Sequence, residues 1–133
     1  MECLKIDKMQ HKKIFISSTQ SEFKEERKLL AEYLNSDALL CKFFDVFLFE
    51  NLPANNKKSG KVYLDAVKQC DIYIGLFGKE YGYETTDGTS PTEKEFNCAV
   101  KNHKVKLIFV TAHKDTERHP KELKLIKKLK NMS

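Results

Sequence analysis

The sequence lacks the features that mark several large classes of protein. None of its apolar runs approaches the roughly 18 residues of a membrane-spanning helix, and its opening, MECLKIDKMQHKK, is too polar for the apolar segment of a secretory signal. The four cysteines form no C-x-x-C pair and the four histidines lie far apart, so zinc-binding patterns are absent. We therefore predict a cytoplasmic protein with reduced, mostly structural cysteines, no metal and no membrane partner.

Internal repeats and low-complexity segments are also missing, and the composition is that of an ordinary globular domain. Of the 133 residues, 41% are hydrophobic and 32% are charged, which suits one domain with a core that needs no covalent or metal support. Residues 1–12 are interpreted as a flexible leader. Residues 13–133 are interpreted as a single α/β domain.

Positive charge is concentrated at the end of the chain. Residues 112–133 hold seven lysines and arginines against three acidic residues, so this segment carries +4 of the total net charge of +5. A basic terminal helix can contact nucleic acid or acidic lipid, but no stacking aromatic residues are interleaved with these lysines. A solvated helix face is the preferred interpretation, and nucleic acid is not expected as a partner of this domain alone.

Four short apolar runs alternate with four segments that carry helix signals. The runs span residues 13–19, 43–49, 72–77 and 105–110, and the second is apolar on both faces apart from Asp45, as in a strand covered by helices on both sides. A capping box formed by Thr19 and Glu22 predicts the first helix. The others are predicted at residues 61–70, with Ser59 as cap, at residues 91–102, and from Pro120 onward.

This alternation predicts a flavodoxin-like three-layer α/β sandwich with a four-stranded parallel sheet in the order 2-1-3-4. In that order, the side on which successive strands are added to the sheet changes between strands one and three. Open α/β sheets bind ligands at such a switch point, at the carboxyl ends of their strands. The fourth strand is then an edge strand, yet its sequence from Leu107 to Val110 carries no charge that would discourage pairing. We expect self-association or a further strand to cover it.

Residues 71–99 hold the features that best indicate a function. The third strand leads into a loop rich in tyrosine, glycine and acidic residues, and Ser90-Pro-Thr-Glu then gives an N-cap, a proline at the first helical position and a capping-box Glu93. The cap does not need Glu95, which lies at the margin of a buried stripe formed by Phe96, Ala99, Val100 and His103. Glu95 is the candidate catalytic carboxylate, and Asp87 is a second available acid. The alternative is that Glu95 is one more solvated acid.

The switch point of the sheet predicts which residues meet the ligand. The carboxyl end of strand one supplies two hydroxyls, the end of strand three supplies a glycine and two aromatic rings, and both lie at one edge of the sheet. The predicted ligand-binding residues are Ser17, Ser18, Gly78, Tyr81 and Tyr83. Alternatively, the two tyrosines simply cover the end of the sheet.

Five segments in order, KIFISST, VFLFENLPA, YLDAVKQCDIYIGLFG, YGYE and SPTEKEF, resemble a prokaryotic TIR-like domain family of unknown function. The resemblance spans residues 13–130. It implies a TIR-like form of the predicted fold and an N-terminal module attached to helicase-like, ATPase or other regulatory regions.

Two better-understood relatives of that family bear on chemistry. TIR domains that cleave NAD carry the catalytic glutamate in an E-x-x-x-A arrangement at a helix start, and Glu95 to Ala99 matches it. Nucleoside deoxyribosyltransferases place their nucleophilic glutamate in E-x-G-x-A after a D-x-G-T type loop. Asp87-Gly88-Thr89 is similar to that loop, but its distance to Glu95 is longer and Asn97 replaces the glycine.

Two functions follow as hypotheses. The first is cleavage of an N-glycosidic bond, most plausibly the nicotinamide–ribose bond of NAD or a related nucleotide, which would be substrate rather than cofactor; Glu95 would stabilise or attack the sugar cation. The second is a non-catalytic signalling or ligand-sensing module that regulates a helicase-like or ATPase partner. The resemblance implies that residues 51–60 form the surface through which such modules self-associate.

Overall fold

A computed structural model describes residues 11–48 and 60–132 of the chain. Sheet strands alternate with helices throughout, and two short 3-10 helices, η2 and η4, lie in the connections. The elements are β1 (Lys12–Ser17), α1 (Gln20–Ser36), η2 (Leu40–Lys42), β2 (Phe44–Phe47), α2 (Gly60–Gln69), β3 (Ile72–Phe77), α3 (Pro91–Lys101), β4 (Val105–Val110), η4 (Asp115–Glu117) and α4 (Pro120–Asn131).

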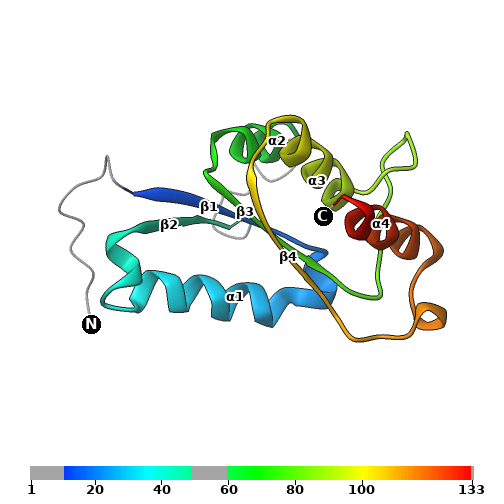
Figure 1. The fold of residues 1–133 in the computed structure, drawn as a ribbon, viewed down its shortest axis with the longest axis horizontal. Helices are drawn as coiled ribbons and strands as arrows, with labels where there is room; N and C mark the ends of the chain where they lie inside the picture. The colour runs from blue at the N-terminus through cyan, green and yellow to red at the C-terminus, as the bar shows by residue number, and fades with distance from the viewer. Residues whose placement is uncertain (1–10, 49–59, 133) are drawn as a thin grey trace.

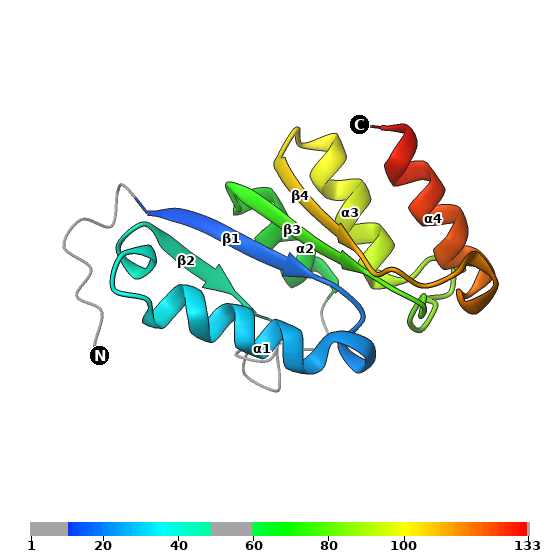
Figure 2. The same cartoon turned by 60° about the horizontal axis from the view of Figure 1, so that its bottom comes forward.

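The four strands form one parallel sheet in the order β2-β1-β3-β4. The predicted α/β architecture and strand order are confirmed. Helix α1 lies on one face of the sheet, and α2, α3 and α4 lie on the other (Figures 1 and 2). The helices that follow β1 and β2 therefore cross opposite faces, and the switch point lies between β1 and β3.

Each face of the sheet has its own apolar core. On the α1 side, Ile14, Ile16 and Ile74 pack against Ala31 and Leu34 of the helix. On the other side, the rings of Phe15, Tyr73 and Phe77 pack under α2, α3 and α4. Phe15 stacks on Tyr73 at 6.3 Å between ring centroids, and Tyr73 meets Phe96 of α3 at 6.2 Å. This alternation of side chains along β1 and β3 is what a sheet covered on both faces requires.

The first predicted capping box does not form. Thr19 is the N-cap of α1 but its side chain makes no capping hydrogen bond. The Glu22 carboxylate instead accepts hydrogen bonds from the backbone amides of Lys79 and Glu80, at 2.8 and 3.0 Å. It comes so close to Gly78 that an added Cβ there would lie 2.2 Å from a Glu22 oxygen. A local capping residue therefore serves a long-range contact between α1 and the loop after β3.

The start of α3 follows its predicted cap only in part. Ser90 Oγ accepts a hydrogen bond from the Glu93 amide at 3.2 Å, as an N-cap should. The Glu93 carboxylate, however, accepts from the Tyr81 hydroxyl at 2.7 Å, and that hydroxyl accepts from the Ser90 amide at 3.1 Å. Tyr81 thus bridges the two residues that the capping box would join directly.

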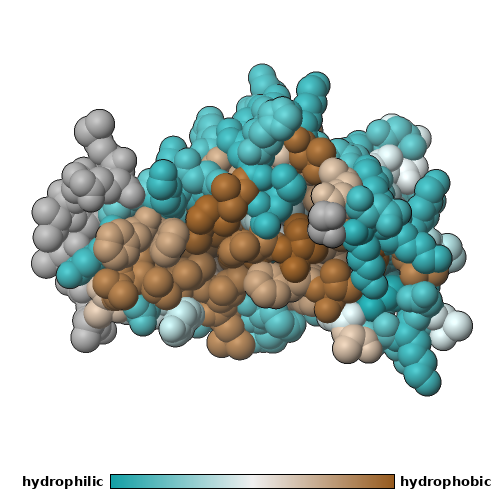
Figure 3. Space-filling model, viewed as in Figure 1, coloured by the Kyte–Doolittle hydropathy of each residue, from teal (hydrophilic) through white to brown (hydrophobic). Residues whose placement is uncertain are grey.

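One face of β4 is apolar and uncovered. Val105, Leu107 and Phe109 are 61%, 47% and 57% exposed, and their register with Ile72, Ile74 and Leu76 places them on the α1 side of the sheet. Helix α1 lies over the β2 half of that side (Figure 2). An apolar band therefore crosses this face of the molecule (Figure 3).

The structure differs from several smaller expectations and agrees with others. Cys70 and Cys98 are free and buried as expected, but Cys41 is disulfide-bonded, so the prediction of reduced cysteines is wrong at that position. His103 is exposed rather than buried, in a left-handed conformation with φ of 54°. The predicted cap Ser59 and most of the loop at residues 51–60 lie outside the described residues. Within the described part of the chain, no helix has both the length and the apolar character to cross a membrane.

Candidate active site

Glu95 stands one turn into α3, opposite the carboxyl end of β1. The Ser17 hydroxyl at the end of β1 donates a hydrogen bond to Glu95 Oε1 at 2.6 Å, although the two residues are 78 positions apart. The loop between β3 and α3 makes this possible, because it returns the chain so that the start of α3 lies beside β1. The carboxyl is thereby fixed by a side chain that is itself fully buried.

The environment of Glu95 favours a proton on its carboxyl. Burial raises the pKa of Glu95 to about 7, while the hydrogen bond from Ser17 and the positive charge of Arg27 act in the opposite direction. A carboxyl with this pKa changes its charge near neutral pH, which is the range in which acid–base and nucleophilic groups are useful. Most surface glutamates have no such property.

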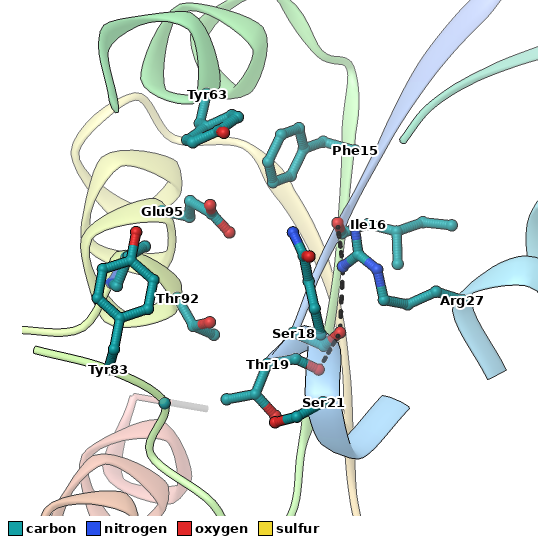
Figure 4. A pocket seen from close by; sticks show the side chains of 13 residues that line it. Phe15, Ile16, Ser18, Thr19, Ser21, Arg27, Tyr63, Tyr83, Thr92 and Glu95 are labelled. Carbon is teal, nitrogen blue, oxygen red and sulfur yellow. Dashed lines mark hydrogen bonds between the residues drawn. The ribbon is translucent and has the colours of Figure 1, made fainter. Parts of the chain in front are cut away.

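Glu95 forms part of the wall of a cavity of about 320 Å³. Figure 4 shows Glu95, Thr92 and Tyr83 on one side of it, facing Ser18, Thr19 and Ser21 on the other. The cavity combines aromatic rings with hydroxyls at the start of α1, and the guanidinium of Arg27 adds positive charge. The described residues in its lining are Phe15, Ile16, Ser18, Thr19, Gln20, Ser21, Arg27, Tyr63, Gly82, Tyr83, Pro91, Thr92 and Glu95.

A second cavity of about 430 Å³ adjoins the first and shares four of its residues, Tyr63, Tyr83, Pro91 and Glu95. It extends towards α2 and the loop before α3, where Lys94 contributes a positive charge. Glu95 therefore lies at the junction of two hollows with different chemistry. A ligand that occupies both would pass directly over its carboxyl.

The predicted site residues are only partly brought together. Ser18 and Tyr83 line the first cavity with Glu95. Ser17 is not part of the described lining, and its hydroxyl donates to the Glu95 carboxyl. Gly78 is buried, and its amide donates to Glu122 at 3.1 Å. Tyr81 is buried under the loop and holds the start of α3, as described above.

Asp87 lies away from Glu95, among exposed loop residues. Hydrogen bonds from the Thr85 hydroxyl and the Thr89 amide lower the pKa of Asp87 to about 2, and Lys94 contacts its carboxylate at 3.3 Å. It lines neither of the two cavities that Glu95 lines. The arrangement gives Asp87 the role of closing a tight turn. Among the residues that the structure describes, Glu95 is the one carboxylate in the lining of the first cavity.

Sequence reasoning missed several residues that line this cavity. Tyr63, Arg27 and Thr92 line it but are not among the predicted ligand-binding residues. Arg27 is 3% exposed and donates hydrogen bonds to the Ile16 carbonyl and to Ser18 Oγ, both at 3.1 Å. The available signal was that Arg27 falls at helical spacing among the apolar residues Phe23, Leu30 and Leu34, since an arginine is rarely buried without a specific partner.

Metal chemistry finds no support in the described residues. Across residues 11–48 and 60–132, no group of three histidine, cysteine, aspartate or glutamate side chains is placed to hold a metal ion.

Comparison with known proteins gives a family and a fold. The profile of a family described as "Domain of unknown function (DUF4062)" matches residues 13–133. No curated protein matches the sequence.

Two solved structures share the fold at low sequence identity. A 2-desoxiribosyltransferase from Leishmania mexicana is 19% identical with a TM-score of 0.52, over 75% of this chain and 65% of that one. The CMP N-glycosidase BcmB of Clostridium botulinum is 17% identical with a TM-score of 0.50, over 92% of this chain and 100% of that one. The chain thus spans about two thirds of the length of the first structure and the whole of the second.

Proposed function

This chain belongs to the DUF4062 family, and we propose that it is a nucleotide-binding module that cleaves an N-glycosidic bond with Glu95 as its catalytic carboxylate. The observation that carries the proposal is the Glu95 carboxyl itself, held by Ser17 at the wall of a cavity with a pKa of about 7. The names of the two structural neighbours, a deoxyribosyltransferase and an N-glycosidase, belong to the same class of chemistry. Because their identity to this chain is below 20%, they support the proposal and do not carry it.

The chemistry asks for a carboxylate near the anomeric carbon. When the bond between that carbon and the base nitrogen breaks, the sugar develops positive charge, and a nearby carboxylate stabilises the cation or attacks it. Water then supplies the oxygen that takes the place of the base. Glu95 meets this need whenever its carboxyl is ionised.

The cavity offers complementary groups for the rest of a nucleotide. Tyr63 and Tyr83 present rings on which a base can stack. Gln20 and Ser21, the first residues of α1, line the cavity beside Ser18, and helix N-termini favour phosphate. Arg27 adds positive charge there without leaving its buried position.

Only one carboxylate is found among the described residues of the lining, and this favours a particular kind of leaving group. A neutral base has to gain a proton as it leaves, which calls for a second acid, and Asp87 does not line the cavity. The nicotinamide of NAD is already cationic and leaves as a neutral molecule without protonation. The E-x-x-x-A likeness of residues 95–99 to TIR domains that cleave NAD points to the same substrate, so NAD is the first to test.

Base release from purified protein tests the proposal. Wild type and Glu95→Gln should be incubated with NAD at high protein concentration, with free nicotinamide measured by chromatography, and in parallel with CMP and deoxynucleosides to test the chemistry named by the neighbours. Release of base by wild type and its loss in Glu95→Gln is the expected result. No release from any of these substrates would contradict the proposal.

A signalling module without catalysis is the second candidate, because one observation favours it. The apolar face of β4 suits a partner or a second copy. Nucleotide binding without base release, together with association through that face, would support this alternative.

A further inference from the structure

Tyr73 carries a buried hydroxyl whose role the fold does not explain. The residue is the second of β3 and is 0% exposed, and its hydroxyl has no hydrogen-bond partner of acceptable geometry among the described residues. Its ring packs between Phe15 and Phe96, where phenylalanine would fill the same space. A buried polar group without a partner costs stability, so its presence calls for a reason other than packing.

The backbone directs this hydroxyl towards Ser17. In the parallel register of β1 and β3, Phe15 is paired with Tyr73 and Ser17 with Gly75, and these side chains lie on the α3 side of the sheet. Gly75 makes room for neighbouring rings, because a Cβ there would lie 3.0 Å from Tyr73 Cε1 and 2.6 Å from Phe77 Cε2. The missing side chain allows the Tyr73 ring to extend along its strand past Gly75.

Electrostatic coupling joins Tyr73, Ser17 and Glu95. Burial raises the pKa of Tyr73 well above its ordinary value, the Ser17 hydroxyl opposes part of that rise, and the charge of Glu95 adds to it. Ser17 uses its single proton in the 2.6 Å hydrogen bond to Glu95, which leaves its oxygen free to accept a proton from another hydroxyl. Tyr73 is the buried donor that lacks a partner.

We propose that Tyr73 is a positioning residue for Glu95, acting through Ser17: when Glu95 is ionised, the Tyr73 hydroxyl donates to Ser17 Oγ, and Ser17 donates to the carboxylate. Hydrogen bonds in a chain polarise and strengthen one another. The two hydrogen bonds from Tyr73 to Ser17 and from Ser17 to Glu95, here called the relay, therefore stabilise the ionised form of Glu95 and leave the protonated form little changed. The relay extends the proposed function and rests on Glu95 as the working carboxyl of that site.

Other charged and titratable groups face Glu95 and must be held constant. The charge of Arg27 on α1 favours the ionisation of Glu95, and burial, together with the charge of Glu95, raises the pKa of Tyr63 on α2. Tyr83, from the loop before α3, lines the same cavity. Tyr63 and Tyr83 line the cavity and are open to ligand, whereas Tyr73 is sealed in the core. A substitution at Tyr73 therefore changes the ionisation of Glu95 without touching the ligand surface.

The test is a pH titration of the Glu95 carboxyl in Tyr73→Phe without ligand. The titration is monitored by NMR with labelled glutamate side chains. Removing the end of the relay should raise the midpoint by roughly a few tenths of a unit, and Ser17→Ala, which removes the direct hydrogen bond, should raise it by on the order of one unit. Tyr33→Phe makes the same chemical change at an exposed position on α1 and should leave the midpoint unchanged.

A second resonance acts as an internal control. Burial also raises the pKa of Glu122 to about 7, so this carboxyl titrates in the same spectra. Its charge also acts on Tyr73, but no hydrogen bond joins the two among the described residues, so its midpoint should move less than that of Glu95 in both Tyr73→Phe and Ser17→Ala. An unchanged Glu95 midpoint in folded Tyr73→Phe overturns the relay. A raised midpoint in a protein that releases no base supports the relay and contradicts only the proposed function, so the two failures are distinguishable.

Discussion

The Tyr81 hydroxyl lies 2.7 Å from the Glu93 carboxylate and 3.1 Å from the Ser90 amide, and it closes the start of α3 from outside the helix. A capping interaction that is usually local is here completed by a residue of the preceding loop. The helix that carries Glu95 is therefore anchored to the loop that carries Tyr83, and these two elements form the same side of the cavity.

Tyr81→Phe should lower the free energy of unfolding by about 1–3 kcal/mol, because the Ser90 amide is left buried without a partner. Glu93→Gln should cost less than about 1 kcal/mol, since its amide oxygen can still accept from Tyr81. Urea unfolding of both variants and of the double mutant measures the coupling. A Tyr81→Phe protein as stable as wild type would show that the bridge contributes nothing.

Glu95→Gln should lose at least about 100-fold in base release while folding normally. The amide keeps the shape of the side chain and can still accept from Ser17, but it never carries the charge that stabilises the sugar cation. Glu93→Gln is the matched control, because it removes a carboxylate from the same helix outside the cavity lining. Equal activity of the two variants would remove Glu95 from the mechanism.

The pH profile of base release should rise with pH through a midpoint near 7 and reach a plateau above it. Below the midpoint the rate should fall about tenfold per unit, because the proposed mechanism uses the ionised form of Glu95. The profile of kcat/KM for NAD measures this in the free protein. A rate that falls as pH rises through 7 would instead assign Glu95 the role of a proton donor.

Stability should decrease between about pH 4.5 and pH 7. Glu95 and Glu122 have folded pKa values of about 7 against an ordinary value of 4.5, so in this window the folded state binds more protons than the unfolded state and loses stability as pH rises. The loss is up to about 3 kcal/mol for each group. Urea unfolding at several pH values should show it, and Glu95→Gln and Glu122→Gln should each flatten the curve.

Asp87→Asn is the control for that experiment. Its pKa is lowered to about 2, so Asp87 is ionised in both states across the window and the variant should keep the slope of wild type. A wild-type stability that stays level from pH 4.5 to 7 would contradict the buried, proton-binding state of both carboxyls.

Phe109→Lys should abolish any self-association that the protein shows in light scattering. The edge strand β4 has an uncovered apolar surface formed by Val105, Leu107 and Phe109. A lysine at position 109 opposes both packing and strand pairing. Met132→Lys is the control, since Met132 is comparably exposed at the far end of α4. If wild-type protein stays monomeric at high concentration, self-association through this surface is excluded, and a partner domain is the remaining expectation.

The sequence by itself determined the order of elements, the parallel sheet and its strand order. The reason is physical: apolar runs with helices between them can form a parallel sheet only with helices on its faces, and the pattern in each run shows which faces are buried. It also singled out Glu95, because the cap signature of residues 90–93 left that carboxylate without a local role. These inferences depend on neighbouring residues, which a sequence displays directly.

Only the tertiary structure decided the partners of these residues. The Glu22 carboxylate binds the amides of Lys79 and Glu80 and not the start of its own helix. The Tyr81 hydroxyl bonds to Glu93 in place of the local capping contact. The Ser17 hydroxyl donates to Glu95 and does not line the cavity. Each is a contact between segments far apart in the chain, set by strand register and by the path of the loop after β3. Local patterns carry no information about contacts between distant segments. For this reason Ser17 was predicted to bind ligand, whereas in the structure it holds the Glu95 carboxyl.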